Sequence, residues 1–195
     1  MRTNITVRRT LIAALILSGY ALTVPAAYAT PTLSVAVASQ RADADQVALL
    51  KRSVSEWNQW RTDNPGVKPD LTEADLAGAN LLGANLSAAD LTDATLTDTN
   101  LTEANLSEAK LTGVKATGAL LFSANLDNAN ANGANLEGAN LSSAKARHTV
   151  FASADLRRAN LAEADLAEAD LTGANLEGAN LNCINHPQCT STPAG

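Results

Sequence analysis

The stretch ADLAEADLTGANLEGANL, residues 164–181, decides the fold because Leu recurs in it at every fifth position. The same register runs without slippage from Leu71 to Leu181, which gives 23 consecutive units of five residues. We call the recurring apolar residue the centre of its unit; 19 centres are Leu, three are Ala and one is Phe151. Two residues before the centre, Ala occupies 19 of the 23 positions, and Asn or Asp occupies 17 of the positions in between.

A period of five matches neither the 3.6 residues of an α-helix nor the two of a β-strand. If each unit forms one side of a square coil, the centre and the Ala two before it point inward, and the other three positions face water. We expect the Asn or Asp to lie at a corner, because these residues tolerate turn conformations and bond to nearby backbone. A disordered low-complexity segment has no reason to keep 23 apolar centres in phase. The pattern therefore predicts an all-β solenoid.

The pattern A-(D/N)-L-x-x over residues 71–181 resembles that of the pentapeptide-repeat family. The resemblance implies a right-handed quadrilateral β-helix with four repeats per coil, hence about six coils. With 20 residues per coil, Phe151 lies directly above Ala131, so that a large centre compensates for a small one. A ligand pocket at the three Ala centres, Ala116, Ala131 and Ala146, is the alternative. The family is functionally diverse, and its fold alone does not determine an activity.

The chain outside the array indicates export. Arg2, Arg8 and Arg9 precede an apolar run, and residues 27–29 fit a signal-peptidase site. Removal of this segment leaves no stable membrane anchor, and we expect the mature chain in the periplasm or outside the cell, or in the thylakoid lumen of a photosynthetic source. The general secretory and twin-arginine routes both stay open. The expected segments are a signal peptide (1–29), a flexible leader (30–42), a capping helix with the segment leading into the array (43–70), the β-helix (71–181), and a C-terminal loop and tail (182–195).

Composition and charge restrict the partners. Apolar residues make up 46% of the chain but aromatic residues only 3%, so the core must be thin and filled by small side chains. The net charge of −6 becomes −9 when three of the 14 basic residues leave with the signal peptide and all 20 acidic ones stay. Direct nucleic-acid binding needs a basic stripe and is not expected. An acidic surface permits cations or basic protein partners.

Both ends of a solenoid need covers, because each exposes apolar residues and unpaired backbone. At the N-terminal end we expect one helix that begins at Asp43 or Asp45, runs to about Thr62 and is ended by residues 63–66. Its apolar face is predicted to cover the first coil; an aromatic ligand site formed by its two tryptophans is the alternative. The residues of this predicted cap are Val47, Leu50, Val54, Trp57 and Trp60.

At the C-terminal end, Cys183 and Cys189 are the only cysteines of the chain. A lone pair six residues apart in an exported protein predicts a disulfide that closes a small loop. The alternative is a metal site formed by these two cysteines and His186. A structural zinc ion needs a fourth ligand, and the only other histidine, His148, lies far back in the array. We therefore predict no metal site and no cofactor.

We do not expect an enzyme, because His148 and His186 are the only bases suited to neutral pH and no catalytic or nucleotide-binding motif is present. One face of the predicted coil carries Leu82, Leu120 and Phe122, a candidate interaction patch for an unknown protein partner or for self-association. Scattered single exposures are the alternative interpretation of the same residues.

Three classes of function follow. The main prediction is an exported, non-enzymatic structural or protein-interaction scaffold. The alternative is an acidic DNA mimic that modulates a type II topoisomerase such as gyrase. This activity is known for some dimeric members of the pentapeptide-repeat family. A signal peptide argues against it, because the topoisomerase is cytoplasmic. A minor alternative is surface or ice binding through the column of Thr72, Thr92 and Thr112, which is interrupted at Asn132 and Ala152.

Overall fold

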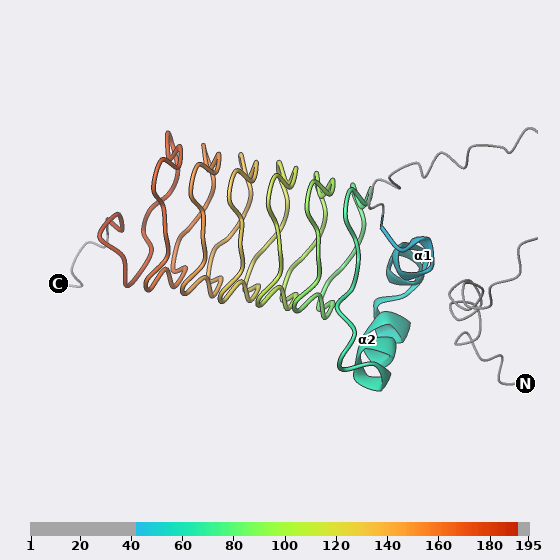
Figure 1. The fold of residues 1–195 in the computed structure, drawn as a ribbon. Helices are drawn as coiled ribbons and strands as arrows, with labels where there is room; N and C mark the ends of the chain where they lie inside the picture. The colour runs from blue at the N-terminus through green and yellow to red at the C-terminus, as the bar shows by residue number, and fades with distance from the viewer. Residues whose placement is uncertain (1–41, 191–195) are drawn as a thin grey trace, which may run out of the picture. The chain divides into compact units, whose positions relative to one another are not determined.

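The computed structural model describes residues 42–190, which contain two helices followed by the repeat array (Figure 1). Helix α1 spans Ala44–Arg52 and helix α2 spans Val54–Asp63. From residue 70 onward every repeat contributes one isolated bridge to a parallel ladder. The predicted signal peptide, the leader up to residue 41 and the tail from residue 191 lie outside the described residues.

Each repeat consists of a short extended segment and a tight turn. In the first repeat the N–H of Ala74 donates to the carbonyl of Leu71 at 3.0 Å, which closes a β-turn. Its third residue, Glu73, has a φ of 57°, and the same position has a positive φ in every turn up to Gly178. A positive φ at the third residue alone characterises a type II turn. The two residues after the centre therefore form the corner.

The Asn or Asp before the centre lies in the middle of a side, so our expectation that it forms the corner was wrong. Asp70 makes a parallel bridge with Asp90 and thus belongs to the ladder. Its Oδ1 accepts a hydrogen bond from the N–H of Thr72 at 3.2 Å. This bond holds the start of the turn from one position upstream, which explains why a residue type favoured at turns occupies a ladder position.

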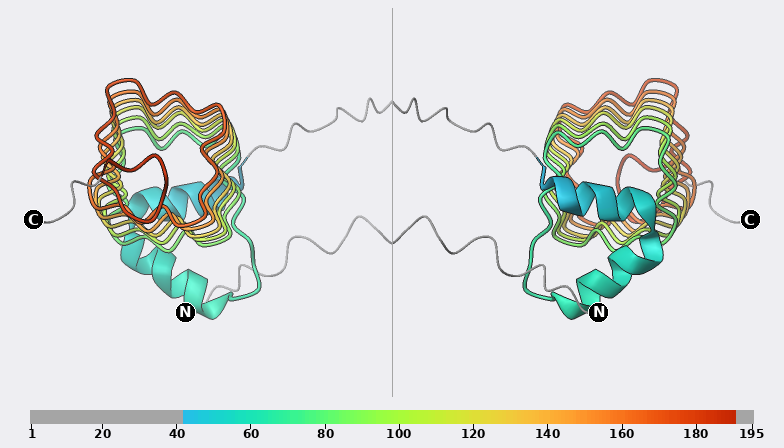
Figure 2. Two further views of the ribbon diagram at one scale, coloured as in Figure 1. Left: turned by 90° about the vertical axis from the view of Figure 1, so that its left-hand side faces the viewer. Right: turned by 90° about the vertical axis from the view of Figure 1, so that its right-hand side faces the viewer.

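Successive coils are joined by a 20-residue register. Bridges pair Asp70 with Asp90 and Asp75 with Thr95, so that four repeats complete one coil (Figure 2). Each repeat with its centre between Leu71 and Leu161 bonds to the next coil in three places, for example through the N–H of Leu71 to the carbonyl of Asp90 at 2.8 Å. We number the four sides by their first centres: face 1 begins at Leu71, face 2 at Leu76, face 3 at Leu81 and face 4 at Leu86, and every fourth repeat returns to the same face.

The core is a single stack of inward side chains, and its irregular centres fit one another. On face 1 the Asn130–Val150 bridge places Phe151 one coil beyond Ala131, and both centres are fully buried. A cavity of about 10 Å³ remains beside Ala116 and Ala131, with an entirely apolar lining. A cavity of this size holds at most one water molecule, and only when polar groups line it. The cavity at these Ala centres is therefore too small to be a ligand pocket.

The segment before the array forms two helices, not the single helix that we expected. Asp43 caps α1 through bonds from the N–H groups of Asp45 and Gln46. Ser53, with extended backbone, caps α2 by accepting from the N–H of Glu56 at 3.2 Å. The break follows from the Ser-x-x-Glu pattern at this point, which favours a new helix start. In the end-on view of Figure 2, α1 lies across the open end of the coil.

The apolar residues expected on these helices pack against the core to different extents. Leu50 and Trp57 are fully buried, at 1% and 0% exposure. Val47, Val54 and Trp60 are partly buried against the same cluster. The rings of Trp57 and Trp60 lie 5.1 Å apart, so the two tryptophans pack on each other.

Candidate interaction surface

Face 3 carries the three residues that the sequence singles out as an interaction patch. Leu82, Leu120 and Phe122 are 49%, 44% and 42% exposed. Leu120 lies in the bridge column, paired with Asn100 on one side and Asn140 on the other. Leu82 and Phe122 follow their centres in the same column, two coils apart. We call these three residues the face 3 patch.

The patch interrupts a ladder of asparagine side chains. Before it, Asn100 Nδ2 donates to Asn80 Oδ1 at 3.1 Å. Beyond it, Asn160 Nδ2 donates to Asn140 Oδ1 at 3.3 Å, and Asn180 continues the ladder. Leu120 occupies the position between these two runs and cannot take part in either.

Leu120 also lacks the side-chain bond that supports neighbouring turns. In the adjacent coils, Asn100 Oδ1 accepts from the N–H of Thr102 and Asn140 Oδ1 accepts from the N–H of Ser142, both at 3.1 Å. A leucine side chain offers no acceptor to the N–H of Phe122. Leu120 therefore lacks these polar bonds and is only partly buried in return, at 44% exposure.

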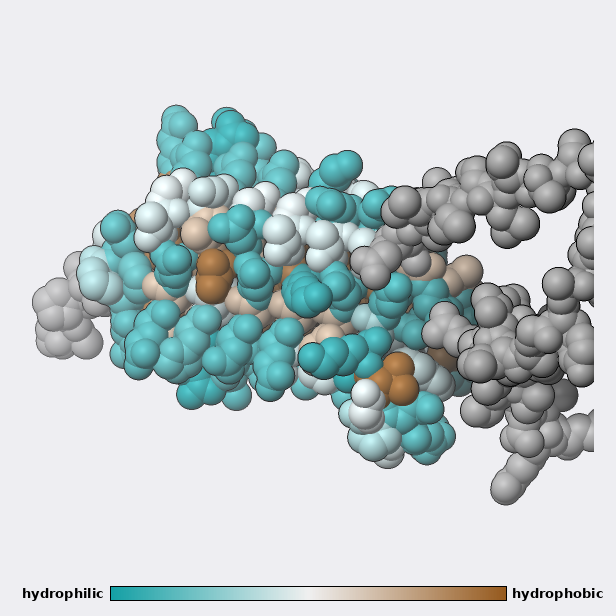
Figure 3. All heavy atoms as spheres, viewed as in Figure 1, coloured by the Kyte–Doolittle hydropathy of each residue, from teal (hydrophilic) through white to brown (hydrophobic). Residues whose placement is uncertain are grey.

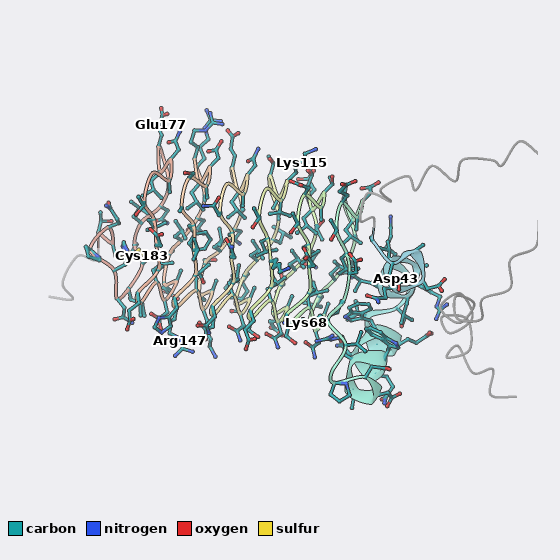
Figure 4. All side chains as sticks on the ribbon, in the orientation of Figure 1. Asp43, Lys68, Lys115, Arg147, Glu177 and Cys183 are labelled. Carbon is teal, nitrogen blue, oxygen red and sulfur yellow. A yellow bond between two sulfur atoms is a disulfide. The ribbon has the colours of Figure 1, made fainter. Side chains whose placement is uncertain are left out.

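Several basic side chains of the array form ion pairs with acidic residues of the same repeat or of the neighbouring coil. On face 2, Arg157 contacts Asp155 at 2.7 Å and Glu137 at 3.1 Å. On face 4, Arg147 forms an ion pair with Asp127. Figure 4 shows Glu177 and Lys115 on one edge of the stack and Arg147 on the opposite edge. The view in Figure 3 is largely hydrophilic, with hydrophobic residues occurring singly.

These pairs shift the titration of the carboxylates. Hydrogen bonds from the Arg147 side chain hold the pKa of Asp127 below its ordinary value. Bonds from the Arg157 side chain lower the pKa of Asp155 in the same way, and the pKa of Arg157 is raised. Both acids are therefore ionised at neutral pH and keep the array negative.

Polar side chains of the helices bond to the edge of the first coil, which sequence reasoning missed. The indole N–H of Trp57 donates to the carbonyl of Asn85 at 2.8 Å, and Asn58 Oδ1 accepts from the N–H of Asn85 at 2.8 Å. Arg61 donates to the carbonyl of Ser87 at 2.8 Å. Burial lowers the pKa of Arg61 from its ordinary value. The only available signal was the polarity of these positions next to an apolar stripe.

Face 1 and face 2 of the first coil receive similar bonds from α1. Gln46 Oε1 accepts from the N–H of Asp70 at 2.9 Å, and Lys51 Nζ donates to the carbonyl of Asp75 at 3.0 Å. The backbone N–H of Asp43 donates to the carbonyl of Asp70 at 2.9 Å. The helices thus supply groups that a preceding coil would otherwise provide.

The two cysteines form a disulfide, as their spacing predicts. Cys183 and Cys189 are joined with their Cα atoms 5.0 Å apart, and Cys183 is fully buried. Ile184 bridges to Asp165, so the loop takes the place of a repeat on face 4. Because both sulfurs are bonded to each other, they are not available as the thiolate ligands of the alternative metal site.

The described residues contain few groups that could perform chemistry. Between residues 42 and 190, no three His, Cys, Asp or Glu side chains gather as metal ligands would. His148 lies beside Glu168 at 3.2 Å on the exposed surface, and His186 Nε2 lies 3.2 Å from the carbonyl of Ala169. Neither α1 nor α2 has the length and apolarity needed to cross a membrane.

Comparison with solved structures finds other repeat proteins. HetL from the cyanobacterium Nostoc sp. strain PCC 7120, involved in heterocyst differentiation regulation, is 31% identical over 60% of this chain and 73% of its own, with a TM-score of 0.26. A protein from the Arabidopsis thaliana thylakoid lumen is 29% identical over 50% of this chain, with a TM-score of 0.29. This chain spans only 61% of that protein. Among curated proteins, none matches this sequence.

The family comparison covers the array itself. The pattern of pentapeptide repeats matches in eight copies, within residues 70–107, 89–122, 104–142, 119–158 and 147–182. Together these matches span more than half of the 195 residues. The five-residue register, the 20-residue ladder and this match agree with one another. The chain belongs to the pentapeptide-repeat family and is a β-solenoid.

Proposed function

We propose that the chain is an exported, non-enzymatic scaffold that binds a protein partner through the face 3 patch. The observation that supports this is Leu120, an exposed apolar residue in a column otherwise occupied by asparagine. Leu120 makes none of the side-chain hydrogen bonds that the asparagines of this column make. A partner that buries Leu120 and Phe122 would remove these apolar side chains from water. Large exposed apolar groups gathered on one face favour association.

The scaffold we propose is a right-handed quadrilateral β-helix of about six coils, closed at its N-terminal end by α1 and α2. The bonds from Gln46, Trp57 and Arg61 to backbone groups of the first coil support this cap. A capped coil keeps its ladder groups from pairing with other chains. This end would therefore serve stability, and the faces would serve recognition.

Export is part of the proposal. The Cys183–Cys189 disulfide supports it, because disulfides persist in oxidising compartments outside the cytoplasm. Fractionation of the native source with N-terminal sequencing tests it. We expect mature chains that begin at Thr30, in the periplasm, outside the cell or in a thylakoid lumen. An intact N-terminus in the cytoplasm would contradict export.

The binding role is tested with a photo-crosslinking residue placed at position 122 in the native source. We expect a covalent adduct with one protein, detected by mass spectrometry. The matched control carries the same residue at position 132, which occupies the equivalent outward position on face 1, the opposite side of the coil. Equal adduct yields at both positions, or none at position 122, would reject the patch as the binding surface.

The acidic surface favours a second candidate, mimicry of DNA toward a type II topoisomerase. Its support is the mature net charge of −9 and the pairing of Arg147 and Arg157 with acidic residues. A supercoiling assay with the mature protein tests this candidate. Inhibition or protection of the enzyme at equimolar protein would favour mimicry, and an unchanged supercoiling rate would exclude it.

A further inference from the structure

Coils within the array offer a fixed set of backbone groups to the coil before them. On face 2, the carbonyl of Thr95 accepts from the N–H of Leu76 at 2.9 Å, and the N–H of Thr95 donates to the carbonyl of Ala74 at 2.9 Å. Two residues later, the carbonyl of Thr97 accepts from the N–H of Gly78 at 2.9 Å. One side of a coil thus presents two acceptors and one donor toward the N-terminal end. The first coil has no coil before it, so these groups need other partners.

The segment before the array fills all of these groups on face 1 and on face 4. On face 1 the partners are two backbone N–H groups just before α1 and the side chain of Gln46. On face 4 the partners are the side chains of Trp57, Asn58 and Arg61. These two edges are therefore closed to any further strand.

Faces 2 and 3 keep an open edge at this end. On face 2, Lys51 Nζ donates to the carbonyl of Asp75 at 3.0 Å, which fills one group of the three. The N–H of Asp75 and the carbonyl of Ala77 have no partner among residues 42–190. On face 3, the N–H and carbonyl of Asn80 and the carbonyl of Leu82 have none within the same range. Two donors and three acceptors are thus available along two neighbouring sides of the coil.

A groove lies beside this edge, at the corner between faces 1 and 2. It has a volume of about 640 Å³ and is formed by α1 and the first coil. Its lining includes the apolar residues Val47, Ala48 and Ala74 and the charged residues Lys51 and Glu73. Because Lys51 also bonds to a carbonyl on face 2, the groove and the open edge adjoin each other.

Negative charge surrounds the groove and the open edge. Glu73 is exposed and forms no ion pair with any residue that the structure describes. Asp75 is exposed on the adjoining side, and Asp93 occupies the same corner as Glu73 one coil further along the stack. The basic residue of the lining, Lys51, is bonded to the Asp75 carbonyl. Charge complementarity therefore favours a partner that brings a lysine or an arginine to this corner.

We infer that the N-terminal edge of faces 2 and 3 binds an extended peptide segment of a partner protein, which adds as a strand to the first coil. The N–H and C=O groups of an extended chain are the complement of the open donors and acceptors, and such strand addition is a common mode of peptide recognition. An apolar side chain of the segment packs in the groove against Val47 and Ala74, and a basic side chain lies near Glu73. Residues 74–83 form the two sides, so a segment of about ten residues covers them.

This inference goes beyond the proposed scaffold role, in which the N-terminal end serves stability. The helices close the apolar end of the stack and two of its four edges, and the two remaining edges serve recognition. The binding site uses only the backbone of Leu82 and no other residue of the face 3 patch. The two proposals can therefore fail separately.

Peptide selection tests the chemistry of the partner. The probe is a phage-displayed library of random ten-residue peptides, selected for binding to the mature protein. We expect enriched peptides with apolar residues at alternate positions and at least one lysine or arginine, because side chains of an extended strand alternate between two directions. Enrichment of no sequence, or of sequences that lack either feature, would overturn the inference.

A pair of variants at position 75 tests the edge with a synthetic copy of the most enriched peptide. Asp75→Pro and Asp75→Ala both lose the carboxylate, but only the proline variant loses the open N–H. Proline is tolerated on an edge strand where the N–H is unpaired. We expect the dissociation constant, measured by fluorescence anisotropy, to be about tenfold higher for Asp75→Pro than for Asp75→Ala. Equal dissociation constants would exclude this edge as the binding site.

A second pair of variants separates this site from the face 3 patch. Glu73→Gln should raise the dissociation constant of the same peptide by about twofold to fivefold, because it removes the unpaired charge at the groove. Phe122→Ala is the control and should bind the peptide as the unmodified protein does. Weaker binding by Phe122→Ala with unchanged binding by Glu73→Gln would assign the peptide to the face 3 patch and overturn the inference.

Hydrogen exchange on the unmodified protein covers the case in which Asp75→Pro does not fold. The amides of Asp75 and Asn80 should exchange about tenfold more slowly when the peptide is saturating. The amide of Leu176, which has no acceptor within residues 42–190 at the other end of the array, is the internal control and should not change. Unchanged rates at Asp75 and Asn80 would contradict the inference. Slow exchange of both amides before peptide is added would mean that the edge is already covered, and the inference would also fail.

Discussion

Ala88 holds its backbone at a φ of 53°, a conformation that an L-residue with a Cβ adopts only at a cost. The array has many such positions, because each type II turn needs a positive φ at its third residue. Glycine fills only some of them, for example Gly78 and Gly83. At the residue scale the fold is therefore strained at its corners, and this strain is offset by the bonds between coils.

Ala88→Gly should raise the free energy of unfolding by about 0.5–1 kcal/mol, since it removes the Cβ from a positive-φ position. Ala77→Gly is the matched control, because Ala77 is the second residue of its turn and has no positive φ. That variant should lose a similar amount through added flexibility of the unfolded chain. Urea denaturation measures both. Equal shifts of the same sign would contradict the turn assignment.

Trp57→Phe should lower the free energy of unfolding by about 1–2 kcal/mol, because the Asn85 carbonyl loses its indole donor while most of the ring packing stays. Trp60→Phe is the control, since Trp60 is only partly buried and its indole has no hydrogen bond within residues 42–190. Thermal melting followed by circular dichroism distinguishes the two variants. Equal losses would argue against the cap.

The coils are stabilised by stacking, so the size of each centre determines how well it packs against the centres of the coils before and after it. Ala131→Leu should destabilise the array because its side chain would meet Phe151 one coil away. Phe151→Leu should destabilise it by about 1–2 kcal/mol through a new cavity. The double variant restores a regular Leu column, so its loss should be smaller than the sum of the two. Additive losses in this double-mutant cycle would contradict the stacking register.

Ion pairs on the array, one between coils (Arg147–Asp127) and one within a repeat (Arg157–Asp155), predict a loss of stability in acid. The folded-state pKa values of Asp127 and Asp155 are lowered by Arg147 and Arg157, so their contribution is present above the unfolded value of about 3.9. It is lost as pH falls through the folded values. The melting temperature should drop between pH 5 and pH 2, and Asp127→Asn should flatten this dependence. An unchanged slope in that variant would mean that the pair contributes nothing.

At the scale of the whole molecule, the sequence predicts the parts of the fold that repeat. The Leu71–Leu181 register, the inward centres and the Cys183–Cys189 pair all follow from spacing. The corner position does not, because an Asn that supports a turn from the preceding side of the coil has the same sequence preference as an Asn within a turn. The bonds from Arg61 to the first coil are long-range and have no periodic signal.

The face 3 patch likewise combines features that follow from the repeat spacing with one that depends on how the coils stack. The 20-residue period places Leu120 and Phe122 on one face, and their exposure follows from their outward positions. That Leu120 breaks an asparagine ladder becomes visible only when neighbouring coils are stacked.

The central claim is that a 20-residue register fixes the direction of every outward side chain. Spin labels at Leu82→Cys and Ala162→Cys test it most directly, because these residues lie in one column of face 3, four coils apart. Double electron–electron resonance should give a narrow distribution centred near 19 Å between the backbone sites, at about 4.8 Å per coil. A broad distribution around 50 Å, as expected for about 80 residues of flexible chain, would contradict the account.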